Sequence, residues 1–179
     1  MKAFEEVKPN LILTVPLILE KIYKKMILPQ LSKTTMKVAL NIPLLDSRIY
    51  AQIRKKLVDA FGGRFREVIV GGAAMNEEVT NFLYKIKFPF TIGYGMTECG
   101  PLISYDHNDE YVPGSCGQIL KGIMKVRIDS EDPYNKVGEI QVSGENVMKG
   151  YYKNEEATSK VFTEDGWLRT GDFGDDRRR

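Results

Sequence analysis

Two short stretches of the 179-residue chain combine residue types that suit contact with a nucleotide. The first, residues 93–98, reads Gly-Tyr-Gly-Met-Thr-Glu and offers an aromatic face, a hydroxyl and a carboxylate. These groups suit a base, a phosphate and Mg²⁺ respectively. The second, residues 71–75, reads Gly-Gly-Ala-Ala-Met and lacks bulk, so that a flat ring can approach its backbone. Taken alone, glycines at such places are also explained by ordinary turns.

Several other chemistries find no support in this sequence. Neither loop matches the GxxxxGK[ST] phosphate loop or the GxGxxG dinucleotide fingerprint. Cys99 and Cys116 form no CxxC pair and have no histidines nearby in metal-ligand order, which argues against a zinc site. We interpret Cys99 as a small loop or core residue and not as a catalytic thiol. His107, the only histidine, is interpreted as a polar loop residue and not as a base.

The elements that must position these loops begin with a strand and two helices. Residues 11–15 predict a buried strand, and Pro16 stands where proline is tolerated, at the start of a helix. A second helix is expected from about Leu45 and ends near the Gly62-Gly63 pair, which can supply its C-terminal cap. The apolar faces predicted for these helices are Leu19, Ile22, Tyr23, Met26 and Ile27 in the first, and Leu45, Ile49, Ile53 and Leu57 in the second.

Each glycine-containing loop directly follows a further predicted strand. Residues 68–70 are a short β-branched strand that runs into the first loop, and residues 90–92 are a strand that runs into the second. Between them Asn76 resembles an N-cap, followed by an apolar stripe at Val79, Phe82, Leu83 and Ile86. This order implies a parallel sheet covered by helices, whose ligands bind beyond the carboxyl ends of the strands.

After about Asp106 the pattern changes to short strands separated by turns. Residues 125–128 and 139–142 predict strands, helical periodicity disappears, and turns such as Asp132-Pro133 intervene. We expect an antiparallel region, a small barrel or sandwich, packed on an α/β first half. The expected domains are residues 1–106, residues 107–174, and a truncated or engineered end at residues 175–179, where three arginines close the sequence.

Read together, the motifs of the chain resemble those of the adenylate-forming, or AMP-binding, superfamily, which contains acyl-CoA synthetases, luciferases and the adenylation domains of peptide synthetases. The opening stretch from Pro9 to Ile22 is most similar to long-chain fatty acyl-CoA synthetases. The motifs that carry the resemblance are, in order, Gly71–Met75, Gly93–Glu98, Gly138-Glu139-Ile140, Gly144, Gly150-Tyr151-Tyr152, Gly166-Trp167 and Thr170-Gly171-Asp172.

The resemblance implies a role for each site residue. Tyr94 would pack against adenine, with the backbone of Gly72 and Ala73 on the other side. Asp172 would grip both ribose hydroxyls, and Gly95 would leave room for the acyl group. Ala74 and Met96 complete the expected nucleotide-binding residues.

The residues expected to act in catalysis are Thr97 and Glu98. Thr97 would contact the α-phosphate, and Glu98 would be the Mg²⁺ ligand. The implied reaction uses ATP, Mg²⁺ and CoA: a fatty acid carboxylate attacks the α-phosphorus, pyrophosphate leaves, and the thiol of CoA then displaces AMP. Catalysis would rest on positioning and on neutralising charge, without a side-chain nucleophile.

The resemblance also predicts that parts of the family pattern are missing. No segment before Gly71 resembles the Ser/Thr/Gly-rich loop ending in Pro-Lys that holds the β- and γ-phosphates. Beyond Asp172 the family continues to a ribose-contacting arginine, a hinge and a small domain with the catalytic lysine. We therefore expect an internal fragment that is inactive alone and binds adenylates weakly or not at all. Loss of upstream sheet would also expose apolar surface and favour self-association.

Composition limits the partners. Lysine and arginine total 26 against 24 acidic residues, a net charge of +2, which argues against nucleic acid or an anionic membrane as the main partner. The longest apolar stretch, residues 11–19, is about half the length of a membrane-spanning helix. We expect a cytoplasmic protein, and peripheral membrane contact through a lipid-like substrate stays open.

Two alternative functions stay open. One is another adenylating enzyme, such as an acetyl- or aryl-CoA ligase or an amino-acid adenylation domain. The other is a non-catalytic module on the same fold.

Overall fold

The computed structural model of the protein describes residues 2–176, which divide into two compact units. Within these residues unit 1 consists of residues 2–94 and 106–117, and unit 2 of residues 95–105 and 118–176. The expected domain limits at residues 106/107 and 174/175 stay a prediction. Residues 177–179 of the expected truncated end lie outside the described residues.

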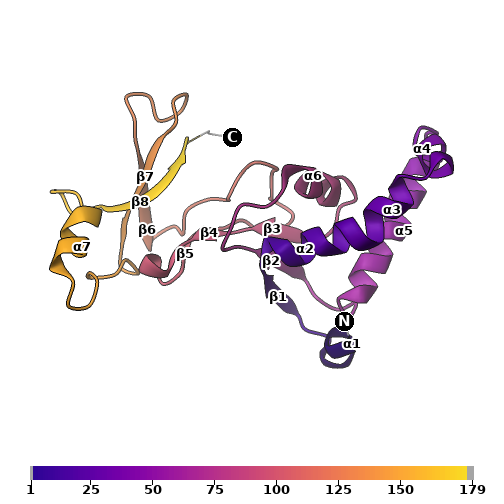
Figure 1. The fold of residues 1–179 in the computed structure, drawn as a ribbon, viewed down its shortest axis with the longest axis horizontal. Coiled ribbons are helices and arrows are strands. Elements are labelled where there is room, and N and C mark those ends of the chain that lie inside the picture. Colours follow the sequence, from indigo (N-terminus) through magenta and orange to yellow (C-terminus); the bar gives the residue numbers. More distant parts are fainter. Residues whose placement is uncertain (1, 177–179) are drawn as a thin grey trace. The chain divides into compact units, whose positions relative to one another are not determined.

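Unit 1 contains a three-stranded parallel sheet, as predicted (Figure 1). Its strands are β1 (Leu11–Thr14), β2 (Glu67–Val70) and β3 (Phe90–Ile92), in the order β1-β2-β3. Both pairs are parallel. Because β2 is central, its apolar residues Val68 and Val70 are almost completely buried, whereas β1 is an edge strand with Leu13 exposed.

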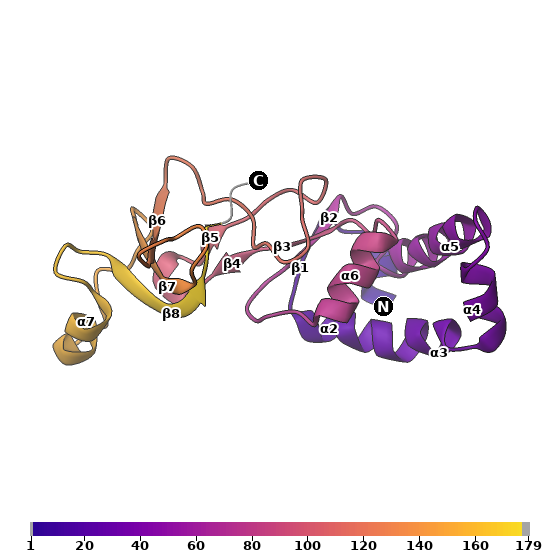
Figure 2. The same cartoon turned by 90° about the horizontal axis from the view of Figure 1, so that it is seen from above.

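Helices make up most of the remainder of unit 1, and three of them were predicted from the sequence. Figure 2 shows α4 connecting the far ends of α3 and α5. The helical elements are α1 (Lys2–Val7), α2 (Pro16–Ile22), the π-helix η1 (Tyr23–Ile27), α3 (Leu28–Leu31), α4 (Thr34–Leu40), α5 (Leu45–Ala60) and α6 (Glu77–Lys85).

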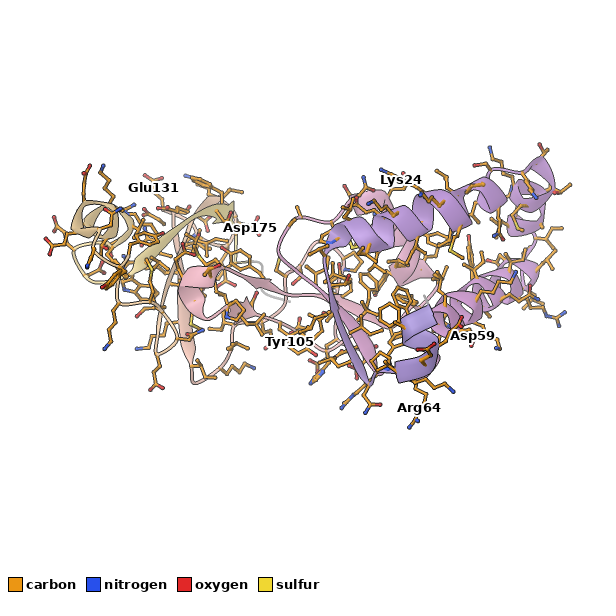
Figure 3. All side chains as sticks on the ribbon, turned by 60° about the horizontal axis from the view of Figure 1, so that its bottom comes forward. Lys24, Asp59, Arg64, Tyr105, Glu131 and Asp175 are labelled. Atoms are coloured by element: carbon orange, nitrogen blue, oxygen red, sulfur yellow. The ribbon has the colours of Figure 1, made fainter. Side chains whose placement is uncertain are left out.

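The core of unit 1 lies between the sheet and these helices. Its centre is aromatic, with ring centroids of Phe61, Phe65 and Phe88 5.8–6.0 Å apart. Charged side chains such as those of Lys24 and Arg64 lie on the outside (Figure 3). The core also takes in apolar side chains from β1, α2, η1, α5, α6 and the C-cap of α6, namely Ile12, Leu19, Tyr23, Ile27, Leu57, Val79, Leu83 and Ile86.

The expected buried strand at residues 11–15 is an edge strand in which only Ile12 is buried, whereas Leu11, Leu13 and Val15 are exposed. Two positions predicted to lie on buried helix faces are also wrong. Met26 is 47% exposed, because η1 is π-helical and its wider turn rotates position 26 away from the face that buries Tyr23 and Ile27. Leu45 is also exposed, at the first turn of α5, and the apolar stripe of that helix becomes fully buried only near its end, at Leu57.

Unit 2 is built on antiparallel strands, as predicted for the small barrel or sandwich, but its sheets are not closed into a barrel. Strands β6 (Met124–Asp129), β7 (Gly138–Gly144) and β8 (Leu168–Gly174) form a sheet in the order β6-β7-β8. A second, two-stranded sheet pairs β4 (Tyr94–Gly95) with β5 (Leu102–Ser104). Three strands leave β6 and β8 as edges, too few to close a sheet on itself.

Unit 2 also contains helices that the sequence did not predict. The short 3₁₀-helix η2 (Thr97–Cys99) follows β4, and α7 (Glu155–Val161) lies between β7 and β8. Asn154 caps α7 by accepting a hydrogen bond from the Ala157 N–H at 3.0 Å. A helix of seven residues is too short for a 3.6-residue period to stand out. Among residues 2–176 no helix has the length and apolar character required to cross a membrane.

Candidate functional site

Gly71 and Gly93, which begin the two glycine loops, lie side by side in unit 1, at the carboxyl ends of β2 and β3. The Gly71 N–H donates to Thr14 O at 3.1 Å, and the Gly93 N–H donates to Val70 O at 2.9 Å. A β-carbon on Gly71 would lie 3.3 Å from Gly93 O, so the two backbones run close together. Gly72 has φ +84°, a conformation that favours glycine.

The loop after β2 is exposed and fixed at its far end. Residues 72–74 are exposed to solvent. The loop then enters α6, where Asn76 Oδ1 accepts from the Val79 N–H at 3.2 Å. The Asn76 N–H itself donates to Glu20 Oε1 at 3.0 Å. The predicted N-cap is thereby confirmed, and the exposed backbone before it has the access that contact with a flat ring requires.

The second loop continues into unit 2 as a tight hairpin. The Met96 N–H donates to Pro101 O at 2.8 Å, and the Cys99 N–H donates to Met96 O at 2.9 Å, which closes the turn η2. A β-carbon on Gly95 would overlap Pro101 O. The close approach of two backbones therefore requires glycine at this position. The expected role of Gly95 in leaving space for an acyl group stays a prediction beside this local reason.

The Glu98 carboxylate is held by a tyrosine from a distant part of unit 2. The Tyr151 hydroxyl donates to Glu98 Oε1 at 2.9 Å. This hydrogen bond, more than partial burial, raises the pKa of Tyr151 above its ordinary value. The Met148 N–H fixes the main chain of the same residue by donating to Glu98 O at 2.7 Å. Side chain and backbone of Glu98 are thus both constrained by residues that follow β7.

Cys99, the residue that follows Glu98 in the chain, is fully buried. Burial, with a smaller contribution from the Glu98 charge, raises the pKa of its thiol from 9.0 to about 11. A thiol with so high a pKa is a weak nucleophile at neutral pH, in line with the interpretation of Cys99 as a core residue.

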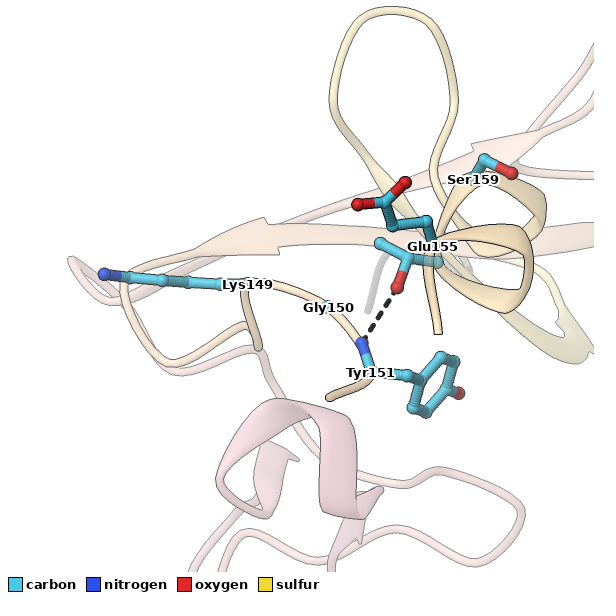
Figure 4. A pocket seen from close by; sticks show the side chains of 6 residues that line it. Lys149, Gly150, Tyr151, Glu155 and Ser159 are labelled. Carbon is cyan, nitrogen blue, oxygen red and sulfur yellow. Dashed lines mark hydrogen bonds between the residues drawn. The ribbon is translucent and has the colours of Figure 1, made fainter. Parts of the chain in front are cut away.

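A surface pocket of about 400 Å³ lies beside Tyr151 (Figure 4). The Tyr151 N–H donates to Thr158 Oγ1 at 2.9 Å, shown as the dashed line in Figure 4. A β-carbon on Gly150 would lie 2.7 Å from Thr158 Cγ2, so the chain passes α7 in tight contact. These contacts fix the main chain of Tyr151 independently of Glu98. The pocket is lined by Lys149, Gly150, Tyr151, Glu155, Thr158 and Ser159.

Asp172 lies on an irregular part of β8. Three residues of β8, from Thr170 to Asp172, oppose the single position 140 of β7, which makes a bulge. Gly171 has φ +75°, and its N–H donates to Glu139 Oε1 at 3.3 Å. The other oxygen of Glu139 accepts from the Arg169 guanidinium at 3.1 Å. Bulges redirect side chains, and this one presents Asp172 at the surface.

The predicted site residues are therefore distributed over both units. Gly72, Ala73, Ala74 and Tyr94 belong to unit 1, whereas Gly95, Met96, Thr97, Glu98 and Asp172 belong to unit 2. Within residues 2–176 no group of three or more histidine, cysteine or acidic side chains is arranged to hold a metal. A carboxylate that acts alone fits Mg²⁺ bound together with nucleotide phosphates, not a cage made entirely of protein ligands.

Sequence reasoning missed two residues that hold this site in place, Tyr151 and Glu139. Both lie in motifs noted above, Gly150-Tyr151-Tyr152 and Gly138-Glu139-Ile140, to which no role was assigned. The only signal available was their occurrence in those motifs, because their partners lie 53 and 32 positions away in the sequence.

This combination of fold and loops agrees with what comparison with known proteins finds. The sequence model of the family described as AMP-binding enzyme matches residues 1–152. The chain therefore belongs to the AMP-binding enzyme family.

Individual relatives are acid–CoA ligases of two substrate classes. The chain is 30% identical to long-chain-fatty-acid–CoA ligase 1 of Saccharomyces cerevisiae, over 96% of this chain and 27% of that protein. It is 35% identical to 4-coumarate-CoA ligase 1 of Narcissus pseudonarcissus, over 74% of this chain and 26% of that protein. The chain thus spans about a quarter of the length of these curated relatives.

Solved structures give the same picture of the fold. The crystal structure of ATP-bound MatB from Rhodopseudomonas palustris matches with a TM-score of 0.70 and 25% identity, over 99% of this chain and 31% of that chain. O-succinylbenzoate coenzyme A synthetase from Bacillus subtilis, in complex with ATP and magnesium ion, matches with a TM-score of 0.67 at 22% identity, a likeness of fold alone.

Proposed function

We propose that this chain is the part of an AMP-forming acid–CoA ligase that contacts adenine, ribose, the α-phosphate and Mg²⁺. The observation that carries the proposal is the Thr97–Cys99 turn, where a hydroxyl and a constrained carboxylate stand next to each other. Thr97 is exposed and Glu98 is half-buried, so both are accessible to a ligand. Membership of the AMP-binding family supports the same function.

The Glu98 side chain suits the metal role in this proposal. Of its two oxygens, Oε1 accepts the Tyr151 hydroxyl, and Oε2 accepts no hydrogen bond from residues 2–176. Oε2 is therefore available to a hard cation, which prefers oxygen ligands. Mg²⁺ bound there with the phosphates of ATP would neutralise negative charge that develops around the α-phosphorus.

The other side chains would bind and orient the substrates. The Thr97 hydroxyl can donate a hydrogen bond to an α-phosphate oxygen, and the two oxygens of Asp172 can each accept one from a ribose hydroxyl. With the nucleotide held in this way, a substrate carboxylate attacks the α-phosphorus and pyrophosphate leaves. The thiol of CoA then attacks the acyl carbon of the adenylate and releases AMP.

We propose a long-chain fatty acid as the carboxylic acid. The yeast fatty-acid ligase aligns with 96% of the chain, against 74% for the 4-coumarate ligase of Narcissus pseudonarcissus. The stretch from Pro9 to Ile22 also resembles long-chain fatty acyl-CoA synthetases. Pyrophosphate release by the longest natural polypeptide that contains this chain, assayed with palmitate, 4-coumarate and acetate, would test the assignment. Preference for palmitate is expected, and preference for 4-coumarate or acetate would refute it.

Nucleotide binding by the 179-residue chain itself is tested by calorimetry with ATP, AMP and a fatty acyl-adenylate mimic. We expect weak binding or none, because this sequence contains no recognisable loop for the β- and γ-phosphates and no recognisable catalytic lysine. Micromolar affinity for ATP would contradict that expectation.

A cytoplasmic location remains part of the proposal, in accord with two cysteines that form no disulfide.

A further inference from the structure

The motif Gly150-Tyr151-Tyr152 has no part in the proposed nucleotide contacts, yet it reaches the central residue of the site. The preceding residues already hold the turn. Asn146 Nδ2 donates to Cys99 O at 2.5 Å and to Leu102 O at 3.1 Å, and the Met148 N–H donates to Glu98 O. Asn146 and Met148 therefore hold the backbone of the turn independently of the contact that Tyr151 makes.

Tyr151 differs from these backbone contacts because it acts on the Glu98 side chain. A glutamate side chain has three rotatable bonds, and holding it in one rotamer opposes considerable conformational entropy. The Tyr151 hydroxyl binds one carboxylate oxygen at 2.9 Å, and a hydrogen bond to a charged acceptor is stronger than one between neutral groups. Tyr151 is itself fixed through Thr158, so it can restrain Glu98 and does not simply follow its motion.

We propose that Tyr151 is a positioning residue that orients Glu98, holding Oε1 so that Oε2 is directed to the cation. This inference rests on the proposed role of Glu98 as the Mg²⁺ ligand. A partner that orients a metal-binding side chain supports metal affinity without touching the metal. Replacing Tyr151 by phenylalanine keeps the ring in place and removes only the hydroxyl.

The test titrates Mn²⁺ in the presence of ATP into the longest natural polypeptide that contains this chain, isotopically labelled, and obtains the affinity from the paramagnetic broadening of the Thr97–Cys99 amide signals in NMR spectra. Wild type is compared with Y151F, E98Q and Y152F. Tyr152 is a matched control because it is the next residue, is 88% exposed and makes its one described contact, with Lys153, through its ring. We expect about tenfold weaker Mn²⁺ binding in Y151F. Y152F should behave as wild type, and E98Q should lose the site.

The outcomes separate this inference from the function on which it rests. Equal Mn²⁺ affinity in Y151F and wild type, together with loss of binding in E98Q, would overturn the role of Tyr151 alone. An Mn²⁺ affinity that is unchanged in E98Q would refute the metal role of Glu98 and this inference with it.

Discussion

Replacement of Asn146 by aspartate tests whether an amide donor holds the turn that carries Thr97 and Glu98. Asn146 Nδ2 donates to two carbonyl oxygens, those of Cys99 and Leu102. Each hydrogen bond contributes about 0.5–1.5 kcal/mol net, so N146A is expected to lower the free energy of unfolding of unit 2 by about 1–3 kcal/mol. N146D should be at least about 1 kcal/mol worse than N146A, because a carboxylate cannot donate and places charge against two carbonyl oxygens.

Asn154 provides a control with the opposite expectation for the same substitution. Its side-chain oxygen accepts a hydrogen bond from the Ala157 N–H at the start of α7. Aspartate accepts equally well there, and its charge suits a helix N-terminus, so N154D should change stability by less than about 0.5 kcal/mol. N154A should be destabilised by about 1 kcal/mol.

The assay is urea unfolding followed by the fluorescence of Trp167. This is the only tryptophan of the chain and belongs to unit 2, which also contains Asn146 and Asn154. The reasoning would be refuted if N146D were as stable as wild type, or if N146D and N154D were equally destabilised. Either result would mean that the donor character of the Asn146 amide does not stabilise the turn.

Four further outcomes follow from the structure. In a C116S variant, Cys99 should react with a thiol reagent at pH 8 at least about a hundredfold more slowly than an exposed thiol of pKa 9.0, since its own pKa is about 11 and its side chain is fully buried. Because that pKa is raised by folding, stability should fall as pH rises from 9.0 towards 11, and a flat urea midpoint over this range would contradict the shift. E139A removes the acceptor of two hydrogen bonds in the β8 bulge and should lower stability in urea by about 1–3 kcal/mol, whereas E131A, at a 90% exposed side chain, should change it by less than about 0.5 kcal/mol. Sedimentation velocity should reveal association of the chain through edge strand β1, where Leu13 is 74% exposed, and L13K should reduce it; equal sedimentation of the two proteins would exclude this edge.

The sequence by itself determined the elements whose signals are local. A β-branched run such as residues 68–70 is enough to indicate a buried strand, and Asn76 before an apolar stripe is enough to indicate a helix start. Strand, helix and strand in succession then imply a parallel sheet, which the register of β2 and β3 confirms. The family could also be predicted from the sequence, because the order of the motifs along the chain is itself a property of the sequence.

Local sequence patterns gave wrong predictions where a segment is short or where contacts with the rest of the fold determine its conformation. The seven-residue helix α7 is too short to show a period, and the π-helical turn η1 moves Met26 off the face that its spacing predicts. The antiparallel half was expected to form a barrel or sandwich, because alternating strands and turns do not reveal how many strands pair in one sheet. Only the pairing of β6, β7 and β8 decides that the sheet remains open.

For the candidate site, too, some features could be predicted from the sequence and others only from the tertiary structure. Residue types within a short loop indicated Thr97 and Glu98 as candidates, and the resemblance to the adenylate-forming superfamily added Asp172. Only the tertiary structure decided what holds them, because the Tyr151 hydroxyl and the Glu139 carboxylate meet their partners across tens of intervening residues. A hydrogen bond depends on distance and direction in space, and neither can be read from the positions of two residues in a chain.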